Sequence, residues 1–246
     1  MFDYLQQKLI FKSTSLEDSF VFNFKLPFEE IYLKASDGAR LHGVHFKAEN
    51  PKGIVLYLHG NARSMDYWGY WGEQLAATYQ HDVVVMDYRG YGKSRGVREH
   101  LRMLEDTTLF YRYCQQFFPE EKIVVFGRSL GGAFASYISK KKEPGKLIIE
   151  SSFTSLADVV KTKFRFLPTE TLLKYPFQNE ENIPHIANKT FFIHGTEDTL
   201  VPYELGQKLY KLSSGQEKEL FTIEGGLHNN LREYEAYFKA LEAILY

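Results

Sequence analysis

Three polar side chains have the types and the chain order that a nucleophilic hydrolase requires: Ser129, Asp198 and His228. A serine hydroxyl is a weak nucleophile unless a base takes its proton and an acidic group orients that base. In hydrolases whose nucleophile lies on a strand–turn–helix unit, the three groups occur along the chain in the order serine, acid, histidine. The sequence therefore predicts Ser129 as the nucleophile, Asp198 as the orienting acid and His228 as the base.

The local context of Ser129 supports this prediction. Residues 123–126 (Ile-Val-Val-Phe) form an apolar run typical of a buried strand, and residues 127–131 read Gly-Arg-Ser-Leu-Gly. Small residues follow over 133–137, a stretch that favours a helix. A sharp strand-to-helix turn holds its central residue in a strained conformation and needs small flanking residues. The pattern therefore predicts that the turn exposes the Ser129 hydroxyl at its tip.

The acid is expected in the loop that follows an apolar run at 190–193. Asp198 is the first choice and Glu197 the second, because both lie just past the end of that strand. An alternative is that Asp198 only caps the helix that begins near Pro202, a frequent role for aspartate. The serine–acid–histidine order favours the catalytic role.

His228 lies in a glycine-rich loop, Glu224-Gly225-Gly226-Leu227-His228, after the last apolar strand. A loop in this place can bring a histidine to residues from distant parts of the chain. Seven other histidines compete, of which His59 and His194 precede glycines at strand ends and are expected to be structural. A surface histidine in the loop is the alternative for His228.

Two backbone N–H groups are candidates for an oxyanion hole. Leu130 follows the nucleophile, and Asn61 lies in a turn, His59-Gly60-Asn61, between a buried strand and a helix. Such donors stabilise the negative charge that develops on an acyl oxygen. The alternative is that residues 59–61 only form a tight turn. Asp87, which follows another buried strand, is expected to fix a loop by pairing with an arginine such as Arg89.

The rest of the chain supplies the elements that would position these groups. Apolar runs predict strands, and periodic ones predict helices. The expected strands are 19–24, 29–34, 41–46, 54–58, 83–86, 123–126, 146–150, 190–193 and 219–223, and the expected helices include 98–118 and 229–244. This alternation predicts an α/β fold in one domain, 1–246. Its sheet is mostly parallel after an antiparallel N-terminal hairpin, with helices on both faces.

The segment 151–188 is the long interruption between sheet strands, and it is rich in aromatic residues, among them Phe153, Phe164 and Phe166. Its place between two strands predicts a short helical cap over a site at the carboxyl ends of the strands.

Composition narrows the class of protein. The 246 residues carry a net charge of −1, which gives no reason to expect nucleic acid as a partner. One cysteine, Cys114, excludes an internal disulfide and favours a reducing, cytoplasmic location. No histidine–cysteine cluster has metal-ligand spacing, so no metal site is expected.

The N-terminus lacks the basic segment and cleavage pattern of a signal peptide, and no apolar run reaches about 18 residues, the length that spans a bilayer. Phe2, Leu5, Leu9 and Ile10 fall on one helical face. A helix packed on the domain is the first interpretation, and a weak peripheral contact with a membrane surface is the second. The sequence does not predict an oligomeric state.

The motifs taken together resemble the α/β-hydrolase superfamily, and within it the Bem46-like group of ABHD-type serine hydrolases. The resemblance covers residues 28–245 and rests on Tyr57-Leu58-His59-Gly60-Asn61-Ala62, Asp87-Tyr88-Arg89-Gly90-Tyr91-Gly92, Gly127-Arg128-Ser129-Leu130-Gly131-Gly132, His194-Gly195-Thr196-Glu197-Asp198 and Gly226-Leu227-His228-Asn229. It implies a Ser-Asp-His triad, no cofactor, and hydrolysis of an ester, thioester or amide. Many members carry an N-terminal membrane anchor, and no run of that length occurs here.

These observations favour a serine hydrolase that cleaves the carboxylic ester of a small or medium acyl substrate through an acyl-enzyme. A thioesterase or an aminopeptidase-like enzyme with the same triad is the first alternative. An aminopeptidase would want an acidic group near its pocket, for which Glu180 and Glu181 are available. The second alternative is a non-catalytic binding protein on a hydrolase fold.

Overall fold

The computed structural model describes residues 2–164 and 168–246, and its contacts divide the chain into two compact units, Met1–Val125 and Phe126–Tyr246. The prediction of a single domain over 1–246 stays a prediction. Of the aromatic residues expected in the insert, Phe166 lies outside the described residues, as do the side chains of Phe2 and Leu5.

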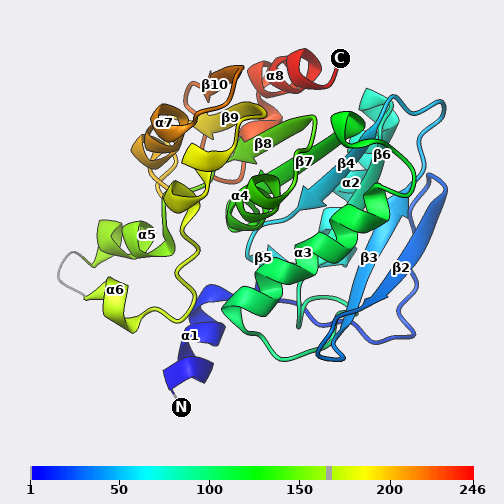
Figure 1. Ribbon diagram of the computed structural model, residues 1–246, viewed down its shortest axis with the longest axis horizontal. Coiled ribbons are helices and arrows are strands. Elements are labelled where there is room, and N and C mark those ends of the chain that lie inside the picture. Colours follow the sequence, from blue (N-terminus) through cyan, green and yellow to red (C-terminus); the bar gives the residue numbers. More distant parts are fainter. Residues whose placement is uncertain (1, 165–167) are drawn as a thin grey trace. The chain divides into compact units, whose positions relative to one another are not determined.

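The first unit is built on four strands in the order β4-β6-β3-β2 (Figure 1). Its elements are α1 (Phe2–Ile10), β1 (Lys12–Ser13), β2 (Phe28–Lys34), β3 (Arg40–Phe46), β4 (Ile54–Leu58), β5 (Ala62–Arg63), α2 (Met65–Tyr79), β6 (Asp82–Asp87), α3 (His100–Cys114) and η1 (Glu120–Lys122), and β7 (Ile123–Arg128) crosses into the second unit. β4 and β6 pair in parallel, while β2–β3 and β3–β6 pair antiparallel. The antiparallel N-terminal hairpin is thus confirmed.

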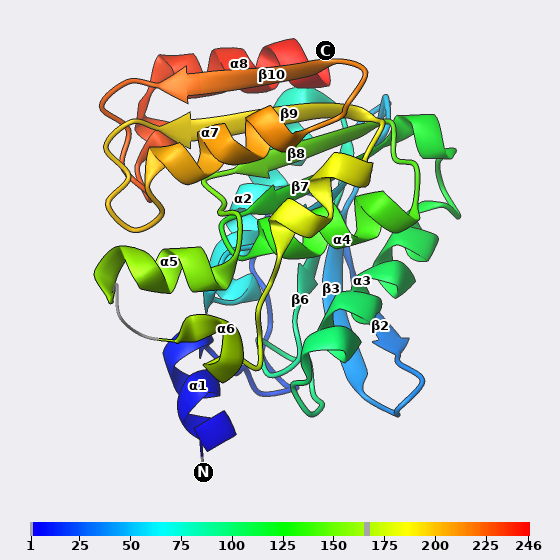
Figure 2. The same ribbon diagram turned by 60° about the vertical axis from the view of Figure 1, so that its left-hand side comes forward.

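The second unit has the strand order β10-β9-β8-β7 and parallel pairing of β8 with β9 and of β9 with β10. Its remaining elements are α4 (Gly131–Lys141), β8 (Lys146–Glu150), α5 (Leu156–Lys163), α6 (Thr169–Leu172), η2 (Asn179–Glu181), η3 (Ile183–His185), β9 (Lys189–Gly195), α7 (Tyr203–Leu212), β10 (Lys218–Ile223), η4 (Leu231–Glu233) and α8 (Glu235–Leu245). Figure 2 shows α4 and α7 on one face of these strands and α8 on the other.

Buried apolar residues explain why the strands form where they do. β4, β6 and β7 are buried along their whole length, as expected for strands covered on both faces. In the first unit α2 packs on β6 and β3, and in the second α4 packs on β8. Cys114, at the end of α3, is fully buried, and burial raises the pKa of its thiol well above the usual range, so it is a core residue as expected.

The strand expected at 19–24 is wrong, because these residues form a turn and an irregular segment. Phe22 and Phe24 are buried, and Phe22 stacks on His42 with ring centroids 5.7 Å apart. The alternation of apolar residues in this segment therefore reflects the burial of its side chains. The segment does not pair with a neighbouring strand.

Two helices are shorter than predicted. α3 ends at Cys114 rather than at 118, and Leu101, expected on its packed face, is exposed. The last helix begins at Glu235 rather than at 229, after the short turn η4. In α1, Leu9 is 71% exposed, so it does not belong to a packed face as predicted.

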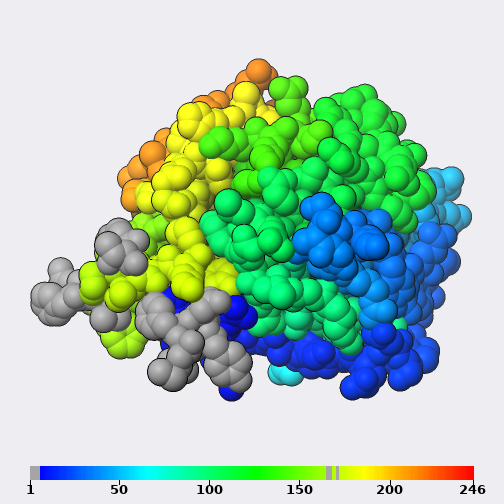
Figure 3. All heavy atoms as spheres, turned by 60° about the horizontal axis from the view of Figure 1, so that its bottom comes forward, coloured from blue at the N-terminus to red at the C-terminus, as the bar shows by residue number. Residues whose placement is uncertain are grey.

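The insert at 151–188 is helical, as expected, and contains α5, α6, η2 and η3 between β8 and β9. Ser136 of α4 donates a hydrogen bond to the Asn179 Oδ1 of η2 at 2.6 Å, and both residues are buried. Figure 3 shows the yellow residues that end the insert on the surface of this face. The end of the insert is therefore fixed to the helix that follows Ser129.

Candidate active site

Ser129 occupies the tight turn between β7 and α4. Its φ is 53°, in the left-handed region that residues with a side chain rarely adopt. The turn is fixed on both sides, because the Ser129 N–H donates to the Glu150 carbonyl at 2.8 Å and the Ser152 hydroxyl donates to the Ser129 carbonyl at 2.8 Å. The structure therefore has the strained elbow that the sequence predicted.

Glycine is required beside the nucleophile because strand and helix come close. A Cβ added at Gly127 would lie 2.4 Å from the Gly131 carbonyl oxygen and 2.5 Å from the Ala135 Cβ. A Cβ at Gly132 would lie 2.2 Å from the Ser152 Oγ. All three distances are below van der Waals contact, so a larger residue at either position would force its neighbours to shift.

His228 lies in the loop between β10 and η4, and its imidazole joins the two other predicted residues. Its Nε2 is 3.1 Å from the Ser129 Oγ, and its Nδ1 is 2.7 Å from the Asp198 Oδ2. All three residues are buried. The structure thus brings together the three side chains that the sequence selected from separate loops.

Asp198 lies in the loop after β9, and both of its carboxylate oxygens accept hydrogen bonds. Oδ1 accepts from the backbone N–H groups of Leu200 and Val201 at 2.9 and 2.8 Å, while Oδ2 faces His228. Asp198 therefore fixes the conformation of its own loop through Oδ1 and faces the histidine through Oδ2. Glu197, the second choice for the acid, is exposed.

The ionisation of Asp198 sets the proton positions in this chain of contacts. Burial alone would raise the pKa of its carboxyl, but hydrogen bonds from His194 and His228 outweigh burial and hold the pKa below its usual range. An ionised carboxylate only accepts hydrogen bonds, so the His228 Nδ1 must carry a proton. In the neutral imidazole, Nε2 is then the acceptor that faces the Ser129 hydroxyl.

Burial also lowers the pKa of His228, and this effect exceeds the opposing hydrogen bond from Asp198. The charges of Arg128 and His194 add to the lowering. The imidazole is therefore neutral near pH 7, which is the state of a general base.

Of the two predicted oxyanion donors, Leu130 is the N-cap of α4 in the second unit. Among the described residues no acceptor is bonded to its N–H. Asn61 lies between β4 and β5 in the first unit, where its side chain donates to the Ile10 carbonyl at 2.9 Å and its carbonyl accepts from Tyr91. That these two N–H groups converge stays a prediction.

Arg128, Glu150 and Tyr237 form a buried polar group beside the candidate triad that the sequence did not suggest. The Arg128 Nε donates to the Glu150 Oε1 at 2.9 Å, and the Tyr237 hydroxyl donates to the Glu150 Oε2 at 2.7 Å. A terminal nitrogen of Arg128 donates to the His228 carbonyl at 2.6 Å. The only signal was the charged residue directly before the nucleophile.

The expected pairing of Asp87 with Arg89 is wrong. Asp87 is fully buried, with the His59 Nε2 3.2 Å from its Oδ1 and the Met65 N–H donating to its Oδ2 at 3.2 Å. Arg89 instead binds Asp106 and Asp37, at 2.6 Å between Nε and the Asp106 Oδ2. Asp106 and Asp37 are distant from Arg89 along the chain, so the sequence alone could not identify them as its partners.

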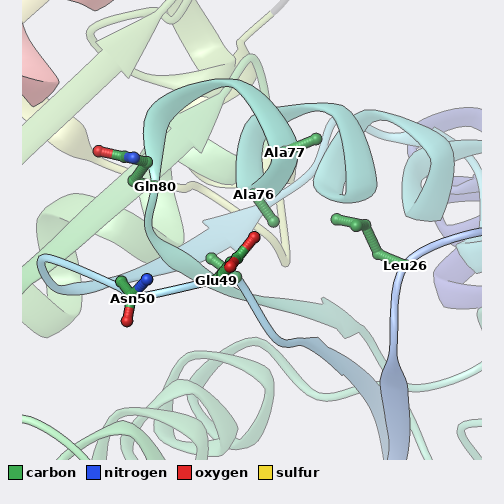
Figure 4. A pocket seen from close by; sticks show the side chains of 7 residues that line it. Leu26, Glu49, Asn50, Ala76, Ala77 and Gln80 are labelled. Carbon is green, nitrogen blue, oxygen red and sulfur yellow. The ribbon is translucent and has the colours of Figure 1, made fainter.

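Two hollows formed by described residues have room for a small ligand. The first, of about 460 Å³, lies in the first unit at the end of α2 (Figure 4) and is lined by Leu26, Ala48, Glu49, Asn50, Ala76, Ala77 and Gln80. None of the predicted site residues lines it.

The second hollow, of about 360 Å³, lies within the insert and includes Asp158 and Glu180 in its wall. Lys208 reaches this pair and lies 2.8 Å from the Glu180 Oε2. Both acidic residues in the wall of this hollow therefore already have a cation within 4 Å.

Within residues 2–164 and 168–246, no group of three or more histidine, cysteine, aspartate or glutamate side chains could hold a metal ion. Across the same residues, none of the helices has the length and apolar character to cross a bilayer.

Comparison with known proteins agrees with the geometry. Residues 49–173, about half of the chain, match a family model described as serine aminopeptidase, S33. The lysophosphatidylserine lipase ABHD12 of Danio rerio is 31% identical over 71% of this chain and 50% of its own. Protein bem46 of Schizosaccharomyces pombe is 27% identical over 90% of this chain and 78% of its own. The chain thus spans about half the length of the ABHD12 relative.

Solved structures show the same fold. An esterase of Pyrococcus furiosus aligns over 96% of this chain and 97% of its own, with a TM-score of 0.73 and 20% identity. The mouse α/β-hydrolase domain-containing protein 10 aligns over 88% of this chain and 96% of its own, with a TM-score of 0.66. From the family match and these structural similarities, the chain belongs to the serine aminopeptidase S33 family of α/β-hydrolases and is of the ABHD and Bem46-like type.

Proposed function

We propose that the protein is a serine hydrolase that cleaves a carboxylic ester of a small or medium acyl group through an acyl-enzyme. The observation that carries the proposal is the continuous hydrogen-bonded chain from the Ser129 Oγ through His228 to Asp198, at 3.1 and 2.7 Å. Asp198 is fully buried as a side chain and is oriented by two backbone donors. This arrangement matches the roles of nucleophile, base and orienting acid.

The reaction proceeds in two steps. The Ser129 Oγ attacks the ester carbonyl carbon while the His228 Nε2 takes the hydroxyl proton, and that proton then passes to the departing alcohol. Water next attacks the acyl-enzyme, with His228 again taking a proton and returning it to Ser129. Asp198 keeps the imidazole in the tautomer that accepts at Nε2.

The N–H groups of Leu130 and Asn61 are proposed to bind the oxyanion in both steps. Leu130 supports this role because it begins α4, so that its N–H points out of the helix start, where the helix dipole favours negative charge. Loss of one such donor typically costs about 3 kcal/mol of barrier.

The acyl group is proposed to lie beside the insert. α5 has no fully buried residue, although it carries Leu156, Val159 and Val160, and Phe164 at its end is exposed. Exposed apolar surface of this kind suits an acyl chain. The name of the ABHD12 relatives adds a lysophospholipid ester to the substrates that should be tried.

The test is labelling by a fluorophosphonate probe together with turnover of p-nitrophenyl esters of increasing chain length. Wild-type protein is expected to be labelled and to turn over short and medium esters. Ser129→Ala, folded to the same extent, should lose both. Folded wild-type protein that neither reacts with the probe nor hydrolyses any ester would instead favour a binding protein on a hydrolase fold.

A second candidate keeps the triad but takes an amide or thioester. The family description names an aminopeptidase, and Asp158 and Glu180 line the hollow in the insert where a free amine could bind. Lys208 competes for that position by pairing with Glu180. Rates on matched ester, thioester and aminoacyl-amide substrates separate the candidates, with the ester expected to be fastest.

A further inference from the structure

Glu150 connects both ends of the proposed proton transfer. Its backbone carbonyl accepts from the Ser129 N–H at 2.8 Å, and its side chain accepts from the Arg128 Nε at 2.9 Å. Arg128 in turn donates to the His228 carbonyl at 2.6 Å and to the Asn229 Oδ1 at 2.9 Å. The backbones of nucleophile and base are therefore both fixed to the same residue.

The loop that carries His228 needs such an anchor. It contains Gly225, with a φ of +72°, and Gly226, and glycines give a loop more conformational freedom than other residues. The Gly225 N–H donates to the Thr196 Oγ1 at 2.9 Å, and the Gly226 carbonyl accepts from the Glu197 N–H at 3.0 Å, so the start of the loop is held to the segment after β9. Neither these bonds nor the bond from the Leu227 N–H to the Asn230 Oδ1 at 2.7 Å connects the loop to β7. Arg128 makes that connection, with a planar group that can hold two acceptors at once.

Stability alone does not account for this buried pair. Arg128 and Glu150 are 7% and 1% exposed. The free energy needed to remove an arginine and a glutamate from water offsets much of their electrostatic attraction. Apolar residues at such positions therefore often give an equally stable fold. Positional accuracy is a stronger reason, since a displacement of about 1 Å between reacting groups can cost about 100-fold in rate.

We propose that Arg128 is a positioning residue, which holds the His228 loop at hydrogen-bonding distance from Ser129 through its contacts with Glu150, the His228 carbonyl and Asn229. Arg128 acts through His228 and does not contact the substrate. The proposal rests on the proposed function, because it concerns the geometry of that triad.

The experiment compares wild type with Arg128→Lys, Arg128→Met and Asn229→Ala, with Arg112→Met, at an exposed position on α3, as the control for loss of an arginine. Turnover of a p-nitrophenyl ester is divided by the amount of protein that a fluorophosphonate probe labels at completion. Arg128→Lys keeps the charge but cannot bridge Glu150 and the loop. We expect its kcat per labelled site to fall about 10- to 100-fold with little change in KM.

The pH profile separates position from charge. The titratable and charged groups that face His228 are Asp198, Arg128 and His194. With lysine at 128 the acid limb of the profile should keep its midpoint. With methionine the midpoint should move to higher pH, because one positive charge near the imidazole is lost. A role confined to folding would leave kcat per labelled site unchanged in both variants, whereas the loss of charge in Arg128→Met moves the midpoint in either case.

Asn229→Ala covers the case in which the Arg128 variants do not fold. Asn229 is exposed, and its loss removes one of the two loop contacts of Arg128. We expect kcat per labelled site to fall about threefold to tenfold, with an unchanged melting temperature. A kcat of Arg128→Lys equal to that of wild type overturns the positioning role. If only Asn229→Ala folds, the same result in that variant overturns it. Absence of turnover in wild type instead overturns the proposed function.

Discussion

At the scale of single residues, the candidate site depends on the charge of one buried carboxylate. Asp198 accepts four contacts: backbone N–H groups from Leu200 and Val201, and imidazoles from His228 and His194. An uncharged amide of the same shape would keep the backbone contacts but could present its NH₂ group to His228. The histidine would then have to reverse its tautomer, and Nε2 could no longer accept the serine proton.

We therefore expect Asp198→Asn to lower kcat by about 10³- to 10⁴-fold while the protein stays folded. The measurement is steady-state hydrolysis of a p-nitrophenyl ester, with circular dichroism to confirm folding. Glu197→Gln is the matched control, because that side chain is exposed, and it should retain wild-type activity. A comparable loss in both variants would contradict the assignment of Asp198.

The pH dependence of activity follows from the lowered pKa of His228. The base must be neutral to take a proton, and a lowered pKa keeps it neutral further into the acid range. The acid limb of kcat/KM should accordingly have its midpoint below 6.5, the ordinary value for histidine. A midpoint at or above that value would show that Asp198 outweighs burial in the free enzyme.

At the scale of elements, the junction of β7 and α4 leaves no room for a side chain at residue 127. Gly127→Ala must push the Cβ against the Gly131 carbonyl, 2.4 Å away, and backbone cannot rotate aside as a flexible side chain can. We expect a loss of about 3 kcal/mol or more in the free energy of unfolding, measured by urea denaturation.

Gly38→Ala is the matched control for that variant. Gly38 has a positive φ of +86°, which Gly127 does not, and an added Cβ at Gly38 would meet nothing within 4 Å. The free energy of unfolding of Gly38→Ala should fall only by the backbone strain of an alanine with positive φ, about 1 kcal/mol. Equal losses at the two positions would show that the close approach of α4 to residue 127 costs no more than the backbone strain of an alanine at residue 38.

The elements also show what the sequence can and cannot predict. Strands buried on both faces, such as β4 and β6, were confirmed because a short continuous apolar run between turn residues is typical of a strand that is covered on both sides. The segment at 19–24 alternates as a strand would, but its rings are buried without strand pairing. Ser129, Asp198 and His228 were found because each follows a strand, whereas Arg128 could not be interpreted until its partners, Glu150 and the His228 loop, were in place.

At the scale of the whole molecule, the half-buried His100 links stability to pH. Burial lowers the pKa of His100 to about 4, so the folded protein keeps this imidazole neutral where the unfolded chain would protonate it. The unfolded state then binds more protons between pH 6.5 and 4. The contribution of His100 is fully present above that range and is lost as the pH falls through it.

We expect the free energy of unfolding to fall by about 2 kcal/mol over this range from His100 alone, with allowance for its partial exposure. Urea denaturation of wild type and His100→Gln at a series of pH values measures the difference. The variant should lose less stability than wild type as the solution is acidified. Parallel curves for the two proteins would show that His100 does not titrate differently in the folded state.

The left-handed backbone at residue 129 has a consequence for how this protein can be altered. A glycine there would relax the turn, while serine and alanine both keep the strain. Ser129→Gly should therefore melt at a higher temperature than Ser129→Ala, although both lack the nucleophile. A screen that rewards heat resistance alone would drift toward this inert form, so directed evolution of the protein must select for turnover at every round.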